Sequence, residues 1–236
     1  MNNFLEKTRG GLIVSCYTAE EQNPLFNQPE AMAALARSVE AGGAAAIRVN
    51  VKWIPLFKSV VKLPIMGIKK VFQGGEMRIT PTLREVEEIA NAGADAVAID
   101  ATRRARFDDL TLEQFIREIK TNFDLAVLGD ISILEEGIHA EEWGMDGVST
   151  TISGYTPYSP NYGKLGDIPP KDPDYQLIDD LCKAIRIPVI CEGRVNTPEK
   201  ALEALKHGAH AVVVGTAITN PQKITELFVA KLNKKY

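Results

Sequence analysis

The sequence predicts a (β/α)8 barrel, in which eight parallel strands alternate with eight helices. Eight short apolar runs alternate with segments of helical spacing, as expected when each strand is buried between two layers and followed by a crossover helix. Glycine also recurs where a helix gives way to the next strand. Eight such units are the number that closes a barrel. An open doubly wound sheet is disfavoured because neither G-x-G-x-x-G nor G-x-x-x-x-G-K-[ST] occurs in the chain.

The predicted strands are short and largely apolar on both faces. In chain order they span residues 11–16, 44–49, 65–68, 96–99, 125–128, 147–152, 188–191 and 211–214. The predicted helices span residues 29–40, 53–61, 82–91, 111–122, 134–143, 174–185, 198–206 and 221–232. Pro198 follows Asn196 and Thr197, which is typical of the first turn of a helix.

Four joins between a predicted helix and the next strand share one pattern. They read Ala41-Gly42-Gly43-Ala44, Ala92-Gly93-Ala94-Asp95, Trp143-Gly144-Met145-Asp146 and His207-Gly208-Ala209-His210. Glycine adopts the left-handed conformation that closes a helix, and its small neighbours let the chain turn directly into a strand. The joins therefore indicate repeated β/α units.

Length and composition indicate one domain spanning residues 1–236. The chain is 45% hydrophobic, enough for one sizeable core, and single α/β barrels reach about 250 residues. With a net charge of −4 and only Arg103, Arg104 and Arg106 close together, the chain shows no footprint for nucleic acid or an anionic membrane. No apolar run approaches the ~18 residues of a membrane span, and Met1 to Arg9 lack a secretory signal's apolar core. We therefore expect a cytoplasmic protein.

Cysteine and histidine provide no metal site. Cys16, Cys182 and Cys191 are too widely spaced for a disulfide framework or a ligand cluster. His207 and His210 stand three residues apart, but Gly208 between them ends a helix, so their rings need not share a face. A zinc site would need further clustered ligands. We expect no metal.

Polar residues gather where the predicted strands end. In a (β/α)8 barrel the active site lies at the carboxyl ends of the strands. Four charged residues lie at or just after the ends of four different predicted strands and therefore converge there: Arg48, Lys70, Asp130 and Glu192. Any one of these residues could be charged simply because a strand end reaches the protein surface. Four of them at one end of the barrel favour an active site.

A lysine in this position suggests two kinds of chemistry. Burial in a dry barrel mouth disfavours an ammonium ion, so such a lysine can serve in proton transfer or in Schiff-base formation. The sequence leaves both open. It also leaves open whether Lys69 or Lys70 faces the barrel, because alternate residues of a strand point to opposite sides.

Two glycine-containing pairs follow the last two strands, Gly193-Arg194 and Gly215-Thr216. Barrels commonly bind phosphate at this place through backbone N–H groups. These pairs favour a phosphorylated small molecule, although the glycines could serve tight turns alone. Residues 153–174, rich in tyrosine, proline and glycine, form a long loop that is either a candidate lid or a solvated insertion.

A family resemblance rests on motifs that run through nearly the whole chain. They are Gly11-Leu12-Ile13-Val14-Ser15-Cys16, Ile47-Arg48, Gly67-Ile68 with Lys70, Ile79-Thr80-Pro81-Thr82, Asp100-Ala101-Thr102, Asp130-Ile131, Thr150-Thr151, Ser153-Gly154-Tyr155-Thr156, Glu192-Gly193-Arg194, Val213-Val214-Gly215 and Ala217-Ile218-Thr219. In these motifs the chain resembles the N-acetylmannosamine-6-phosphate 2-epimerases, which are (β/α)8 barrels of sialic-acid catabolism.

The resemblance implies inversion at carbon 2 of an N-acetylhexosamine 6-phosphate without metal or organic cofactor, and a homodimer. It implies that Lys70 is the proton-transferring base and that Glu192 is its partner in proton handling and ring opening. Asp130 and Arg48 would hold the sugar and the developing charge. The other expected contacts are to the substrate from Ser15, Tyr17, Thr151 and Tyr155, and to the phosphate from Gly193, Arg194, Gly215 and Thr216.

Three positions depart from the family pattern. The chain has Tyr17 where glutamine is usual, Phe72 where aspartate is common and Asn220 where arginine is usual. Each change removes a polar group expected to contact the substrate. Two alternatives therefore stay open: a related isomerase or lyase acting on another phosphorylated sugar, or a protein that binds a sugar phosphate without turnover.

Overall fold

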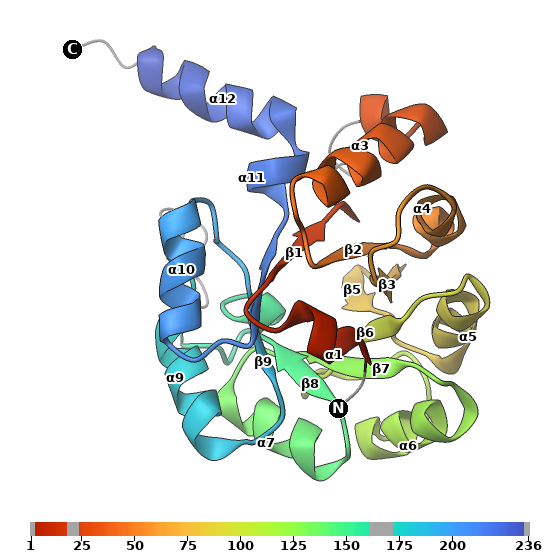
Figure 1. The fold of residues 1–236 in the computed structure, drawn as a ribbon. Coiled ribbons are helices and arrows are strands. Elements are labelled where there is room, and N and C mark those ends of the chain that lie inside the picture. The colour runs from red at the N-terminus through yellow and green to blue at the C-terminus, as the bar shows by residue number, and fades with distance from the viewer. Residues whose placement is uncertain (1–2, 18–23, 161–171, 234–236) are drawn as a thin grey trace.

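A closed barrel of eight parallel strands forms the centre of the molecule, with helices around it (Figure 1). The computed structural model describes residues 3–17, 24–160 and 172–233. Around the barrel the strands follow the order β1-β10-β9-β8-β7-β6-β3-β2. They are β1 (Leu12–Ser15), β2 (Ala46–Asn50), β3 (Ile65–Ile68), β6 (Ala96–Asp100), β7 (Ala126–Asp130), β8 (Gly147–Ser149), β9 (Val189–Glu192) and β10 (Ala211–Val214). The predicted (β/α)8 fold is confirmed.

All eight predicted helices are present. They are α3 (Pro29–Ala41), α4 (Ile54–Val60), α5 (Leu83–Asn91), α6 (Leu112–Asn122), α7 (Leu134–Glu142), α9 (Tyr175–Ala184), α10 (Pro198–Lys206) and α12 (Pro221–Leu232). The glycines at the four predicted joins, Gly43, Gly93, Gly144 and Gly208, have φ between 86° and 96°, the conformation that closes each helix.

Several short elements were not predicted. They are α1 (Asn3–Thr8), the hairpin of β4 (Lys70–Gln73) and β5 (Glu76–Ile79), α11 (Thr216–Thr219) and the 3-10 turns η1 (Pro24–Phe26), η2 (Val51–Trp53) and η3 (Thr150–Ile152). The prediction of a strand over residues 147–152 was wrong at its end, because the chain leaves β8 at Ser149 and turns into η3. Such pieces are too short for hydrophobic periodicity to register.

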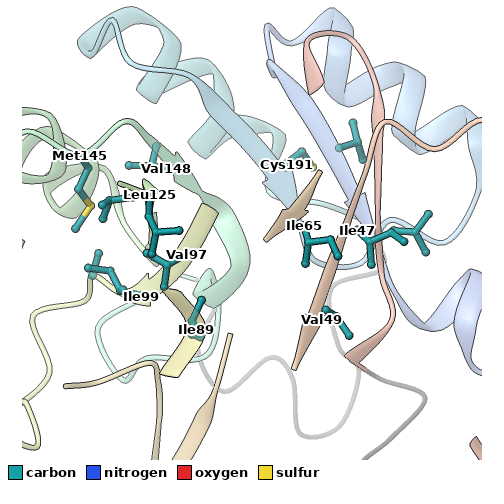
Figure 2. Close-up of a cluster of buried hydrophobic side chains, with 14 of the residues drawn as sticks. Ile47, Val49, Ile65, Ile89, Val97, Ile99, Leu125, Met145, Val148 and Cys191 are labelled. Atoms are coloured by element: carbon teal, nitrogen blue, oxygen red, sulfur yellow. The ribbon is translucent and has the colours of Figure 1, made fainter. Parts of the chain in front are cut away.

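The strands bury side chains on both sides, in two separate clusters. Along β6, Ala96 and Ala98 lie in the cluster inside the barrel, whereas Val97 and Ile99 pack outward against the helices. Figure 2 shows members of this outer cluster, including Ile47 and Val49 of β2. Because alternate residues share a side, the residue that ends a strand with inward parity points into the barrel mouth.

Helix α12 differs from the other outer helices. It extends away from the barrel in Figure 1, and none of its residues is buried. Leu227, Phe228 and Leu232 are 61%, 68% and 80% exposed. Among the described residues, no helix is both long and apolar enough to cross a membrane.

Candidate active site

A buried cluster of three charged side chains joins opposite sides of the barrel. The guanidinium of Arg48, on β2, donates to both carboxylate oxygens of Asp130 on β7, at 3.0 and 2.7 Å. It also donates to Oε2 of Glu192, on β9, at 2.8 Å. Arg48 is 2% exposed and Asp130 is fully buried. Three of the four predicted charged residues are thus in direct contact.

The cluster is held by the turn that follows β8. Thr151 Oγ1 donates to Asp130 Oδ1 at 2.5 Å. Thr150 Oγ1 donates to the carbonyl of Glu192 at 3.0 Å and accepts from its backbone N–H at 3.1 Å. Ser149 Oγ donates to Glu192 Oε2 at 3.4 Å. The unpredicted η3 turn therefore holds the carboxylate of Asp130 and the backbone of Glu192, and Ser149 at the end of β8 contacts the Glu192 carboxylate.

The environment of the cluster affects the pKa of Arg48 and that of Glu192 in different ways. Burial acts to lower the pKa of Arg48, but the charges of Asp130 and Glu192 outweigh burial and raise it, so the guanidinium stays charged. Burial raises the pKa of Glu192 above its usual value, with Asp130 adding to the rise and Arg48 opposing it. A carboxyl group with a raised pKa is suited to giving and taking protons near neutral pH.

The structure distinguishes the two consecutive lysines. Lys70 has the same parity as Met66 and Ile68, which lie inside the barrel, and its Nζ stands 4.3 Å from the ring centroid of Tyr17. Lys69 points the other way, and its Nζ lies 2.5 Å from Oε2 of Glu88 on α5. The inward lysine is therefore Lys70.

The predicted phosphate residues lie together near the ends of β9 and β10. Gly193 has φ 110°, and Arg194 has φ 62°, which is unusual for a residue other than glycine. The guanidinium of Arg194 donates to the carbonyls of Ser153 and Asp172, at 2.9 and 2.8 Å. Gly215 precedes Thr216, the first residue of α11. Phosphate binding here stays a prediction.

The remaining predicted substrate residues have diverse surroundings. Ser15 is buried, and its carbonyl accepts from Thr219 Oγ1 at 2.9 Å. Tyr155 is exposed. Of the candidate lid at residues 153–174, residues 161–171 lie outside the described part of the chain.

Two of the positions that depart from the family pattern do not point to the cluster. Phe72, on the hairpin, is 70% exposed. Asn220 is buried, and its Oδ1 accepts from the backbone N–H of Lys223 at 3.0 Å, which caps the start of α12. Asn220 therefore already has a structural role at a helix terminus.

One buried acid was missed as a site residue. Asp100 ends β6 with inward parity and accepts from the backbone N–H and the hydroxyl of Thr102 at 3.1 and 2.6 Å. It also pairs with Arg104. Burial raises the pKa of Asp100, and Arg104 opposes the rise. The parity of Ala96 and Ala98 in the sequence could have identified it.

The two histidines considered as a ligand pair have separate partners. Nδ1 of His207 lies 2.9 Å from Oδ1 of Asp179, and Nε2 of His210 lies 2.8 Å from the carbonyl oxygen of Leu5. Within residues 3–17, 24–160 and 172–233, no group of three or more His, Cys, Asp or Glu side chains is placed to hold a metal ion.

Buried acids, an arginine and an inward lysine lie at the carboxyl ends of the strands of a closed parallel barrel, the place where (β/α)8 enzymes have their active sites. A family model described as "Putative N-acetylmannosamine-6-phosphate epimerase" matches residues 32–234. The chain belongs to this epimerase family.

Individual relatives agree with the family match. A Caldanaerobacter subterraneus protein named "Putative N-acetylmannosamine-6-phosphate 2-epimerase" is 45% identical over 236 residues, covering 99% of this chain and 95% of its own length. The solved N-acetylmannosamine-6-phosphate 2-epimerase from Clostridium perfringens shares 41% identity with a TM-score of 0.88, over 97% of this chain and 96% of that one. A thiamine phosphate pyrophosphorylase from Pyrococcus furiosus, 15% identical with a TM-score of 0.61, shares the fold.

Proposed function

We propose that this protein is an isomerase that interconverts N-acetylmannosamine 6-phosphate and N-acetylglucosamine 6-phosphate by inverting carbon 2. The observation that carries the proposal is the Arg48–Asp130–Glu192 cluster at the carboxyl ends of the strands, with Lys70 on the inward side of the same mouth. Family membership supplies the substrate. This activity belongs to amino-sugar and sialic-acid catabolism.

The reaction needs a base and a stabiliser for negative charge. The hydrogen on carbon 2 becomes acidic once the ring opens and carbon 1 is an aldehyde. Lys70 takes that proton, and the electron pair of the C–H bond moves to form an enolate with its charge on the carbonyl oxygen. Return of a proton to the opposite face gives the epimer, so no redox cofactor enters the balance.

Glu192 and Arg48 have complementary parts in this scheme. The raised pKa of Glu192 suits it to carry a proton to and from the sugar during ring opening and reprotonation. The buried guanidinium of Arg48 is a fixed positive charge that stabilises the enolate oxygen. Asp130 orients Arg48 through two hydrogen bonds and leaves it little freedom to turn.

The phosphate is proposed to lie against the backbone around Gly193, Gly215 and Thr216. Gly193 has a positive φ, which lets the chain turn there with no side chain in the way. Asn220 caps α12 in place of a charged contact. The loss of one charge-assisted hydrogen bond would weaken binding by about ten- to a hundredfold.

The test follows proton exchange by NMR. The protein is incubated with N-acetylmannosamine 6-phosphate in deuterated water, and the loss of the carbon 2 proton signal is measured with the appearance of the second epimer. Exchange should occur with the native protein and with Lys69→Ala, and should be lost in Lys70→Ala. Exchange with another phosphosugar only, or binding with no exchange, would reject the proposal.

We also propose that the protein is a cytoplasmic homodimer. In addition to the exposed apolar residues of α12, Leu202 of α10 is exposed, so both the helix and the barrel surface present apolar area that a second copy could cover. The three cysteines form no disulfide, in keeping with a reducing compartment. Light scattering should give a dimer mass for the native protein and a monomer mass for the double variant Phe228→Glu, Leu232→Glu, with Lys231→Glu as the control.

A further inference from the structure

We propose that Tyr17 and Thr80 are positioning residues for Lys70. Thr80 fixes the main chain from which Lys70 projects, and the ring of Tyr17 holds its ammonium group. The inference rests on the proposed function of Lys70 as the proton-transferring base, and it adds two residues that act through that lysine.

Thr80 follows β5 and is fully buried. Its backbone N–H donates to the carbonyl of Lys69 at 2.7 Å, and its Oγ1 accepts from the N–H of Lys69 at 3.1 Å. The backbone N–H and the carbonyl of Lys69, the residue before Lys70, are therefore both hydrogen-bonded to Thr80. The direction in which Lys70 leaves the barrel strand follows from these two bonds.

The conformation of Thr80 is strained. Its φ is 47°, a region in which a β-branched residue is an outlier because its side chain crowds the backbone. Such strain persists where the surroundings over-determine it, and it gathers at functional sites. Here the strained residue is also the one bonded to Lys69. The strained backbone thus occurs at the residue that fixes the main chain next to Lys70.

The hairpin separates the two lysines. Lys70 pairs with Ile79 in the antiparallel register of β4 and β5. The pleat then directs Lys69 outward, where its ammonium meets the carboxylate of Glu88. One lysine is committed to an ion pair on the outer face, and the other keeps its inward direction.

Tyr17 supplies the contact at the far end of the Lys70 side chain. Tyr17 is buried two residues after the end of β1, and Lys70 Nζ stands over its ring at 4.3 Å. An aromatic face attracts a cation through its quadrupole, so the ring of Tyr17 holds Lys70 in the ammonium form that exists once the proton has been taken up. A ring can therefore orient an amine that must gain and lose a proton during the reaction.

Two pairs of variants test the two residues: one pair distinguishes the role of the Tyr17 ring from that of its hydroxyl, and the other distinguishes the hydrogen bond of Thr80 from its side-chain shape. Tyr17→Phe keeps the ring, whereas Tyr17→Leu removes it, with Tyr17→Met as the substitute if leucine prevents folding. Thr80→Ser keeps Oγ1, whereas Thr80→Val keeps the shape but loses the acceptor. Melting temperatures check that each variant is folded.

Two measurements are made on every variant. The first is kcat and KM for exchange at carbon 2. The second is the rate at which an amine-acylating reagent modifies Lys70 without substrate, followed by mass spectrometry with Lys183, a 76% exposed lysine of α9, as the internal reference. A cation held over a ring is protected by about 2- to 30-fold, the range that measured cation–π interactions span.

We expect Lys70 to be acylated about 2- to 30-fold faster in Tyr17→Leu than in Tyr17→Phe, and kcat of Tyr17→Phe to exceed that of Tyr17→Leu because only phenylalanine keeps the ring that orients the amine. Thr80→Ser should likewise exceed Thr80→Val in kcat. Equal kcat values and equal acylation rates within each pair would overturn the proposal. If the native protein shows no exchange, the proposed function fails, while the acylation rates still test the contact between Tyr17 and Lys70.

Discussion

Replacing the two carboxylates of the buried cluster by their amides, one at a time, should affect stability unequally. Asp130→Asn removes the charge that makes a bidentate pair with Arg48, at 2.7 and 3.0 Å, in a site where both side chains are shielded from water. Glu192→Gln removes a charge that burial disfavours, as its raised pKa indicates. Arg48 keeps its bidentate partner only in Glu192→Gln.

The size of the first effect follows from the cost of removing the bidentate partner of the buried Arg48, which then keeps only its single hydrogen bond to Glu192. Breaking a buried ion pair by removing one member costs about 3–5 kcal/mol. The entropy of unfolding is about 2.1 cal/mol/K per residue, which for 236 residues gives about 0.5 kcal/mol/K. The melting temperature of Asp130→Asn should therefore fall by about 6–10 °C. Glu192→Gln should melt no lower than the native protein.

The assay is thermal unfolding at neutral pH, measured by calorimetry on the native protein and both variants at one protein concentration. Carbon 2 exchange is measured in parallel, because both variants should lose it whatever their stability. The reasoning would be refuted if Asp130→Asn melted within about 2 °C of the native protein, or if the two variants lost stability equally.

Three further predictions concern pH, packing and backbone strain. Because the pKa of Glu192 is raised in the folded protein from an ordinary value of 4.5, the folded state keeps that proton over a pH range in which the unfolded chain has lost it. The stability of the native protein should therefore fall as pH rises through this range, and the melting temperature of Glu192→Gln should rise relative to that of the native protein. A difference in melting temperature that does not depend on pH would contradict the raised pKa of Glu192. A Cβ on Gly67 would lie 2.5 Å from Cγ2 of Ile89, so Gly67→Ala should cost about 1–3 kcal/mol in urea unfolding, whereas Gly42→Ala, whose φ is negative, should change stability by less than about 0.5 kcal/mol. Arg194 has φ 62°, so Arg194→Gly should be more stable than Arg194→Ala by about 1 kcal/mol, and the reverse order would show that the backbone there is unstrained.

The fold could be predicted from the sequence because its signals are local. Strand-length apolar runs, helical spacing and glycine at the joins each depend on neighbouring residues, and the glycines at positions 43, 93, 144 and 208 have the expected positive φ. The convergence of Arg48, Asp130 and Glu192 was also predictable, because parallel strands bring their carboxyl ends to one mouth. The short hairpin after β3 gave no comparable signal.

The sequence by itself determined the order of β/α units and which charged residues reach the barrel mouth. Only the tertiary structure decided which lysine faces inward, since that depends on the β4–β5 pairing and on the bonds between Thr80 and Lys69. It also decided that Arg194 binds two loop carbonyls and that α12 extends from the barrel instead of packing on it. The physical reason is range: strand and helix patterns repeat over a few residues, whereas these contacts join residues that meet only after the barrel closes.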